Sequence, residues 1–174
     1  MQKSMLLLVF IPTIATVVGC SKSASRPASD LQKSFGLRLN WPGEPHESSQ
    51  DLPSKEGVWK NYMGIFTDKG PDDVIIFTAG VMELPTLQQN NPKDLLESSV
   101  LPLQRDEFTR KDIEHGPKKY PGADITSYSK KSFSRHVVVM AGLRIYTISV
   151  TCREEASLDN SKVRKFLESF GIDE

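Results

Sequence analysis

The amino-acid sequence predicts an α+β fold in which an antiparallel β-sheet is flanked by helices. Three features support this prediction: apolar runs typical of strands, two amphipathic helical segments, and links of hairpin length between several of the strands. The order strands, helix, strands, helix favours antiparallel pairing with helical layers over a doubly wound parallel sheet. Residues 35–174 are therefore expected to form one globular domain.

The first half of this domain contains three predicted strands. Residues 35–41 alternate apolar and polar side chains and stop at Pro42-Gly43, a pair that suits the centre of a type II turn. Two more strands are predicted at 57–67 and 73–84, joined by a turn rich in glycine and proline. Both faces of the last of these strands are apolar, one with Val74, Ile76 and Met82, the other with Ile75, Phe77 and Val81. A strand with two apolar faces needs cover above and below.

A helix is predicted to follow at about 92–103. Asn91 can cap its start, Pro92 suits the first helical position, and the next apolar residues recur at helical spacing. Pro102 must kink or stop this helix because it cannot donate a hydrogen bond to the preceding turn. Further strands are predicted at about 108–115, 123–130, 132–140 and 143–151, the last three close enough for hairpins.

The chain ends in a second predicted helix, residues 161–170. Val163, Phe166 and Phe170 lie on one face of this helix, which is expected to pack back on the sheet. Gly171 is placed to cap its end.

Ahead of the domain, residues 1–19 have the composition of a secretory signal peptide. A short basic start is followed by about fourteen mostly apolar residues, Met5 to Val18, whereas a helix needs about 20 to cross a bilayer. The run ends in Val17-Val18-Gly19-Cys20, which resembles the bacterial lipobox. We therefore expect lipidation of Cys20.

Two alternatives for Cys20 remain: a free thiol after ordinary signal cleavage, or a disulfide with Cys152. Residues 20–34 are polar and are expected to act as the lipidated N-terminus and a flexible tether. Ser21 follows the cysteine instead of the aspartate that signals inner-membrane retention, so outer-membrane placement facing the periplasm is favoured.

Several segments together resemble the PsbP-like domains of uncharacterised bacterial lipoproteins. These segments are the turn at 41–45, "FTAGVMELP" ahead of "NPKDLLESSV", "YPGADITSY", "LRIYTISV" and "VRKFLESFGI". In the family, a Pro-Gly turn introduces the central strand, matched here by Tyr120-Pro121-Gly122-Ala123. The resemblance covers about residues 35–173 and implies an α/β/α sandwich with no catalytic residues to transfer. It also implies an accessory or binding role.

The sequence shows no motif for catalysis, a metal or a cofactor. His46, His115 and His136 stand far apart, with no partner at metal-ligand spacing. Nucleophile motifs and phosphate-binding glycine loops are absent from the sequence. We therefore expect a protein that is not an enzyme and that binds neither metal nor cofactor.

Charge patterning suggests one possible binding edge. The 22 basic and 22 acidic residues balance, which argues against a nucleic-acid partner. Residues 105–153, however, hold ten basic and five acidic side chains. The basic residues near predicted strand ends are Lys118, Lys119, Lys130, Lys131 and Arg135. They could meet anionic headgroups or an acidic partner, or simply keep a sheet edge from pairing with another copy.

The sequence thus predicts a lipid-anchored cell-envelope protein with a non-enzymatic binding or accessory role. Its expected partners are the membrane, through lipid on Cys20, and an envelope protein that the sequence does not identify. The alternative is a small-ligand receptor or an enzyme whose site is assembled from turns. A deep apolar pocket would favour that alternative, and a flat or edge-type surface would favour the binding role.

Overall fold

A computed structural model describes residues 32–54, 57–71, 73–85, 91–129 and 131–173. The strands are β1 (Leu37–Arg38), β2 (His46–Ser54), β3 (Gly57–Lys69), β4 (Val74–Glu83), β5 (Glu107–His115), β6 (Tyr120–Ser129), β7 (Ser132–Ala141), β8 (Arg144–Cys152) and β9 (Gly171–Ile172). The helices are α2 (Pro92–Val100) and α3 (Ser161–Glu168), with 3₁₀ turns at Leu101–Leu103 and Glu155–Asp159.

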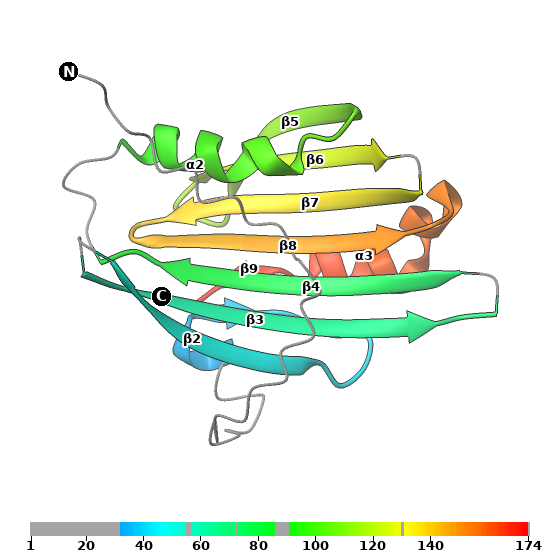
Figure 1. The fold of residues 1–174 in the computed structure, drawn as a ribbon, viewed down its shortest axis with the longest axis horizontal. Helices are drawn as coiled ribbons and strands as arrows, with labels where there is room; N and C mark the ends of the chain where they lie inside the picture. The colour runs from blue at the N-terminus through cyan, green and yellow to red at the C-terminus, as the bar shows by residue number, and fades with distance from the viewer. Residues whose placement is uncertain (1–31, 55–56, 72, 86–90, 130, 174) are drawn as a thin grey trace.

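Seven of these strands form one antiparallel sheet in the order β2-β3-β4-β8-β7-β6-β5 (Figure 1). A second, two-stranded sheet joins β1 to β9, with Leu37 opposite Ile172. The predicted α+β fold with an antiparallel sheet and helices is therefore confirmed. The resemblance to a PsbP-like sandwich remains a prediction.

The two helices lie on opposite faces of the main sheet. On one face, α3 and the β1–β9 pair cover a core rich in aromatic side chains, where Phe166 lies 5.1 Å from both Trp41 and Phe77 between ring centroids. On the other face, α2 covers a smaller core through Leu96 and Val100. Figure 1 shows α2 in front of the β5 end of the sheet and α3 behind its centre.

The capping and proline residues around α2 limit the helix as the sequence predicts. The Asn91 side chain accepts a hydrogen bond from the Lys93 backbone N–H at 3.0 Å, which satisfies one of the free donors at the helix start. The helix ends at Val100, and Pro102 lies in the 3₁₀ turn that follows. On β4, Ile75, Phe77, Ala79 and Val81 are buried, whereas Val74, Ile76 and Met82 on the opposite face are half-buried.

Several predictions about individual elements need correction. The strand predicted at 35–41 is only Leu37–Arg38, and β2 was not predicted because its side chains are mostly polar. Tyr120-Pro121-Gly122 lies inside β6 and is not a turn, because Gly122 pairs with Ile113 of β5 and Val139 of β7. Gly171 does not cap α3: the helix ends at Glu168 and Gly171 pairs with Arg38 in β9.

Candidate functional site

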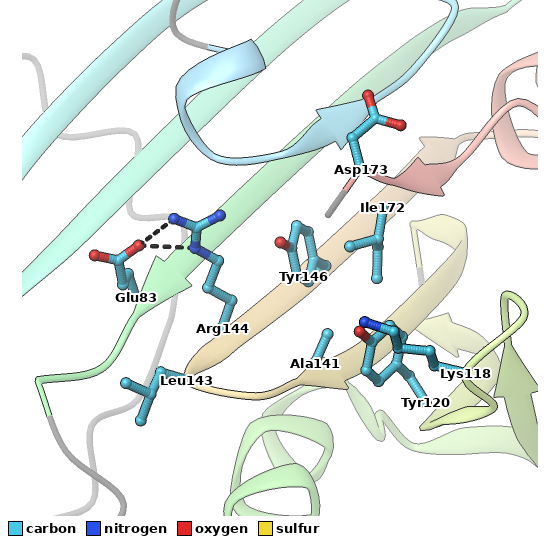
Figure 2. A pocket seen from close by; sticks show the side chains of 9 residues that line it. All are labelled: Glu83, Lys118, Tyr120, Ala141, Leu143, Arg144, Tyr146, Ile172 and Asp173. Carbon is cyan, nitrogen blue, oxygen red and sulfur yellow. Dashed lines mark hydrogen bonds and ion pairs between the residues drawn. The ribbon is translucent and has the colours of Figure 1, made fainter.

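An open cleft of about 460 Å³ lies where five strands end or begin on the α3 face of the sheet (Figure 2). Its walls come from the end of β4, the β7–β8 turn with the start of β8, the β5–β6 turn with the start of β6, and the region of β9. The lining residues are Glu83, Lys118, Tyr120, Ala141, Leu143, Arg144, Tyr146, Ile172 and Asp173. Residues 141–146 contribute four of the nine, and the others come from three further parts of the chain.

The strongest interaction in the cleft joins Arg144 to Glu83. These residues are opposite each other across β4 and β8, and the Arg144 Nε and Nη2 atoms lie 2.7 and 2.6 Å from Glu83 Oε2. Burial opposes the charge of Arg144, but its hydrogen bonds to Glu83 and Tyr146 outweigh this effect and raise the pKa of Arg144. Lys60 Nζ lies 3.7 Å from the other Glu83 oxygen, Oε1.

Tyr146 fixes the floor of the cleft to the N-terminal part of the domain. Its side chain is buried, and its hydroxyl donates a hydrogen bond to the Phe35 carbonyl oxygen at 3.0 Å. Burial is the main cause that raises the pKa of Tyr146, so the phenol stays protonated at neutral pH. Figure 2 shows Glu83 and Arg144 on one side of the cleft, with Lys118 and Tyr120 on the other.

The β9 wall depends on a glycine. Gly36 has a φ of +63°, and its carbonyl oxygen accepts a hydrogen bond from the Asp173 N–H at 2.7 Å. A Cβ at Gly36 would lie 2.5 Å from the Asp173 carbonyl oxygen. A side chain at position 36 would therefore push β9 away from the cleft.

The chemistry of the cleft is suited to recognition. Two cations, Lys118 and Arg144, face two carboxylates, Glu83 and Asp173, so the lining groups carry no net charge. The best-placed acid and base already hold each other through short hydrogen bonds. Such a surface offers fixed donors, acceptors and tyrosine rings to a ligand with both polar and apolar groups.

The predicted basic edge is divided by the structure. Lys118 and Lys119 precede β6, whereas Lys131 follows it, so they lie at opposite ends of a ten-residue strand. Lys119 Nζ lies 3.4 Å from Glu114, and Arg135 on β7 donates to both oxygens of Asp124 at 2.7 and 3.1 Å. Successive hairpin turns fall at alternate ends of a sheet, which is why these residues do not meet. Lys118 lines the cleft, and Lys130 lies outside the described residues.

The three histidines are far apart in the fold. His46 is on β2 and His115 on β5, the two edges of the sheet, and His115 stacks on Phe170 with 4.3 Å between ring centroids. His136 on β7 is 8% exposed, and its Nδ1 lies 2.8 Å from Ser149 Oγ. Burial, aided by Arg105, lowers the pKa of His136 to about 4, so the ring is neutral at neutral pH.

Cys152 is a buried free thiol at the end of β8. Its Sγ lies 3.2 Å from the Glu154 carbonyl oxygen, and burial is the main cause that raises its pKa to about 11. Within the part of the chain that the structure describes, no three His, Cys, Asp or Glu side chains group to hold a metal ion. Cys20, the predicted lipidation site, lies outside that part.

The sequence did not identify the cleft as a site. Glu83 and Arg144 are 61 residues apart, and nothing in either local pattern marks them as partners. The available signal was an acid at the end of one predicted strand and a base at the start of another. Only the β4–β8 pairing, which sequence periodicity does not specify, brings these two positions together.

No helix among the described residues combines the length and the apolar character needed to cross a bilayer.

Neither a family model nor a curated protein matches the chain. Among solved structures, it is similar to the crystal structure of LpqN, which is involved in cell envelope biogenesis of Mycobacterium tuberculosis, with 7% identity and a TM-score of 0.37. The match covers 87% of this chain and 100% of that chain. A likeness this distant transfers neither fold nor function.

Proposed function

We propose that this protein is a lipid-anchored cell-envelope protein whose folded domain binds a partner through the cleft without turning it over. The observation that carries the binding role is the cleft itself, an open site in which the Arg144–Glu83 pair is held at 2.6 Å. A charged pair held in this way presents fixed donors and acceptors to a partner.

The anchoring part of the proposal is supported by sequence. The apolar run ending in Gly19-Cys20 is followed by a polar tether and then by the domain. Each buried methylene of an acyl chain contributes about 0.8 kcal/mol, so two or more chains on Cys20 would hold the domain durably at a membrane. Ser21 after the cysteine favours the outer membrane in a double-membrane bacterium.

The anchor is tested by mass spectrometry of the intact protein from bacterial membranes. We expect residues 1–19 to be missing and a lipid-sized mass on Cys20, and a Cys20→Ser variant to lack this mass. A water-soluble, unmodified chain that starts at another residue would contradict the anchor.

The cleft is tested by placing a photo-crosslinking amino acid at Leu143, which lines the cleft and is 40% exposed. The matched control is Phe108, which is 47% exposed on β5 away from the cleft. In intact membranes we expect one defined adduct from position 143 and none from position 108. The adduct should disappear in an Arg144→Ala, Glu83→Ala double variant that remains folded. Equal labelling from both positions would contradict the proposal.

A further inference from the structure

The outer edge of β2 is a second surface, separate from the cleft. All nine residues of β2 pair with β3, from His46 opposite Ile65 to Ser54 opposite Gly57. No described strand pairs with the other side of β2, where it forms the end of the sheet (Figure 1). Alternate residues of an antiparallel strand direct their backbone N–H and C=O groups away from the neighbour. This side of β2 is therefore an open template for another strand.

The β2 strand and the segment before it are acidic. Residues 39–54 contain Glu44, Glu47 and Asp51 and no lysine or arginine. Within β2, Glu47 and Asp51 are opposite Gly64 and Lys60 of β3, so both side chains lie on the face that Tyr62 shares. An added strand would bring its own side chains next to them on that face.

Glu47 has no cation partner among the described residues. The Glu47 Oε2 atom and the hydroxyl of the fully buried Tyr62 are both buried, and neither has a hydrogen-bond partner of good geometry there. Burial raises the pKa of Glu47, while the nearby Tyr62 hydroxyl opposes the rise. A cation brought in beside Glu47 would compensate for the lost solvation.

We infer that the β2 edge binds an extended, basic segment of a partner protein, which adds a strand to the sheet. This inference goes beyond the cleft and does not depend on it. Backbone hydrogen bonds would supply affinity, and side chains at alternate positions would supply specificity. In antiparallel pairing, partner residues opposite Glu47 and Asp51 are four apart and basic, and the residue opposite half-buried Leu52 is apolar. The expected pattern, in partner order, is apolar-basic-x-x-x-basic.

A second copy of the chain fits this edge less well. Antiparallel self-pairing centred on Ser49 would place Glu47 opposite Asp51, and like charges directly opposite each other are destabilising. Proline at position 53 also removes one backbone donor near the end of the strand. The acidic edge and the Glu47 carboxylate, which Tyr62 stabilises only in part, both favour a basic partner.

The test uses the full-length chain in detergent and an eleven-residue peptide of threonine and valine that carries the sequence leucine-lysine-x-x-x-lysine. We expect binding in calorimetry, and a fall in the pKa of Glu47 followed by carboxyl NMR. A Glu47→Gln, Asp51→Asn double variant should weaken binding by at least about tenfold. The matched peptide with glutamate at both lysine positions should not bind. Equal binding of both peptides, or a Glu47 pKa that does not move, would overturn the inference.

A proline pair separates backbone pairing from charge. Ser49 and Gln50 are adjacent, so one N–H points to β3 and the other points outward. We compare the variants Ser49→Pro and Gln50→Pro. The variant that removes the outward N–H should keep the stability of the wild type and should no longer bind the peptide. Retained peptide binding in that stable variant would overturn the inference.

Two further outcomes identify other occupants and would also overturn it. Sedimentation showing dimers that a Gln50→Lys variant abolishes would assign the edge to a second copy. Binding that occurs only after deletion of residues 21–31 would assign it to the chain's own N-terminal segment, which includes Lys22 and Arg26. Either result leaves the proposal for the cleft intact, because that proposal is measured from position 143.

Discussion

The two edges of the main sheet, β2 and β5, differ in charge and in cover. Five of the nine β5 side chains are charged, and they include Arg110 and Lys111. Arg110 reaches onto α2, where its Nη1 and Nη2 donate to the two carboxylate oxygens of Glu97 at 2.7 and 2.6 Å. β2 carries two acids and no lysine or arginine.

The two edges therefore differ in how they are protected against pairing with other chains. Sheets guard their edges with positive charge, proline, bulges or a covering helix, because an open edge invites pairing with other chains. The β5 edge has charge of both signs, and Arg110 links it to α2. The β2 edge keeps only Pro53 and its acids, which repel another acidic edge and attract a basic one.

The largest expected effect concerns α2, which packs on β6 and β7 next to the β5 edge. Leu96 of α2 is 5% exposed and packs in the smaller core. Leu96→Ala should lower the free energy of unfolding by about 2–5 kcal/mol, since it removes buried methyl groups and leaves a cavity. Urea denaturation measures this change.

The matched control lies on the β2 side, at Val58 of β3, which is 50% exposed. Val58→Ala should change the free energy of unfolding by no more than about 0.5 kcal/mol. Similar losses for both variants would show that the packing of α2 on the sheet contributes no more stability than a half-exposed side chain of β3.

A smaller effect is expected from pH, through His136 on the side of the sheet that α2 covers. Its pKa is about 4 in the folded protein and about 6.5 unfolded, so the unfolded chain binds more protons between these values. Stability should be full above pH 6.5 and fall by up to about 3 kcal/mol as pH approaches 4. Thermal unfolding measured between pH 4 and pH 7 tests this loss of stability.

Carboxylates also lose stabilising interactions in acid, so the wild-type slope alone does not identify His136. The pKa values of Asp73 and Glu97, for example, are lowered in the folded protein. The difference between wild type and a His136→Gln variant isolates the histidine. An unchanged slope in that variant would exclude His136 as the cause.

The third prediction concerns the ion pair that links β5 to α2. Arg110→Ala should cost about 1 kcal/mol, because two parallel charge-assisted hydrogen bonds to Glu97 are lost from a partly exposed pair. The loss should shrink in high salt. On the other edge, Asp51→Ala should cost less, and an equal cost would remove the contrast between the edges.

The smallest expected effect has the opposite sign. Because burial raises the pKa of Glu47, the ionised carboxylate is less stable in the folded protein than in water. Glu47→Gln should therefore raise stability at neutral pH by less than about 1 kcal/mol. The folded state holds the proton more tightly, so the gain should disappear as pH falls below the unfolded pKa of the carboxyl. A loss of stability would show that the carboxylate has a compensating partner.

The elements with strong local signals could be predicted from the sequence. Asn91, Pro92 and Pro102 set the limits of α2 through backbone rules that act within a few residues. The apolar run of β4 likewise identifies a strand in any surroundings.

The open edge and the cleft could not be predicted in the same way. The β2 sequence HESSQDLPS has no apolar alternation, because most side chains of this edge strand are exposed to solvent. β2 is a strand because its backbone pairs with β3. The cleft depends on β4 meeting β8, two strands that the whole of α2 and three other strands separate in the chain.

The measurement that tests the contrast between the edges most directly is hydrogen exchange at the backbone amides of β2 and β5, with and without the basic peptide. When the peptide is added, hydrogen exchange should slow at alternate backbone amides within residues 46–52 and stay unchanged within residues 107–115. Protection of β5, or no protection of β2 at peptide concentrations that saturate binding, would contradict this prediction.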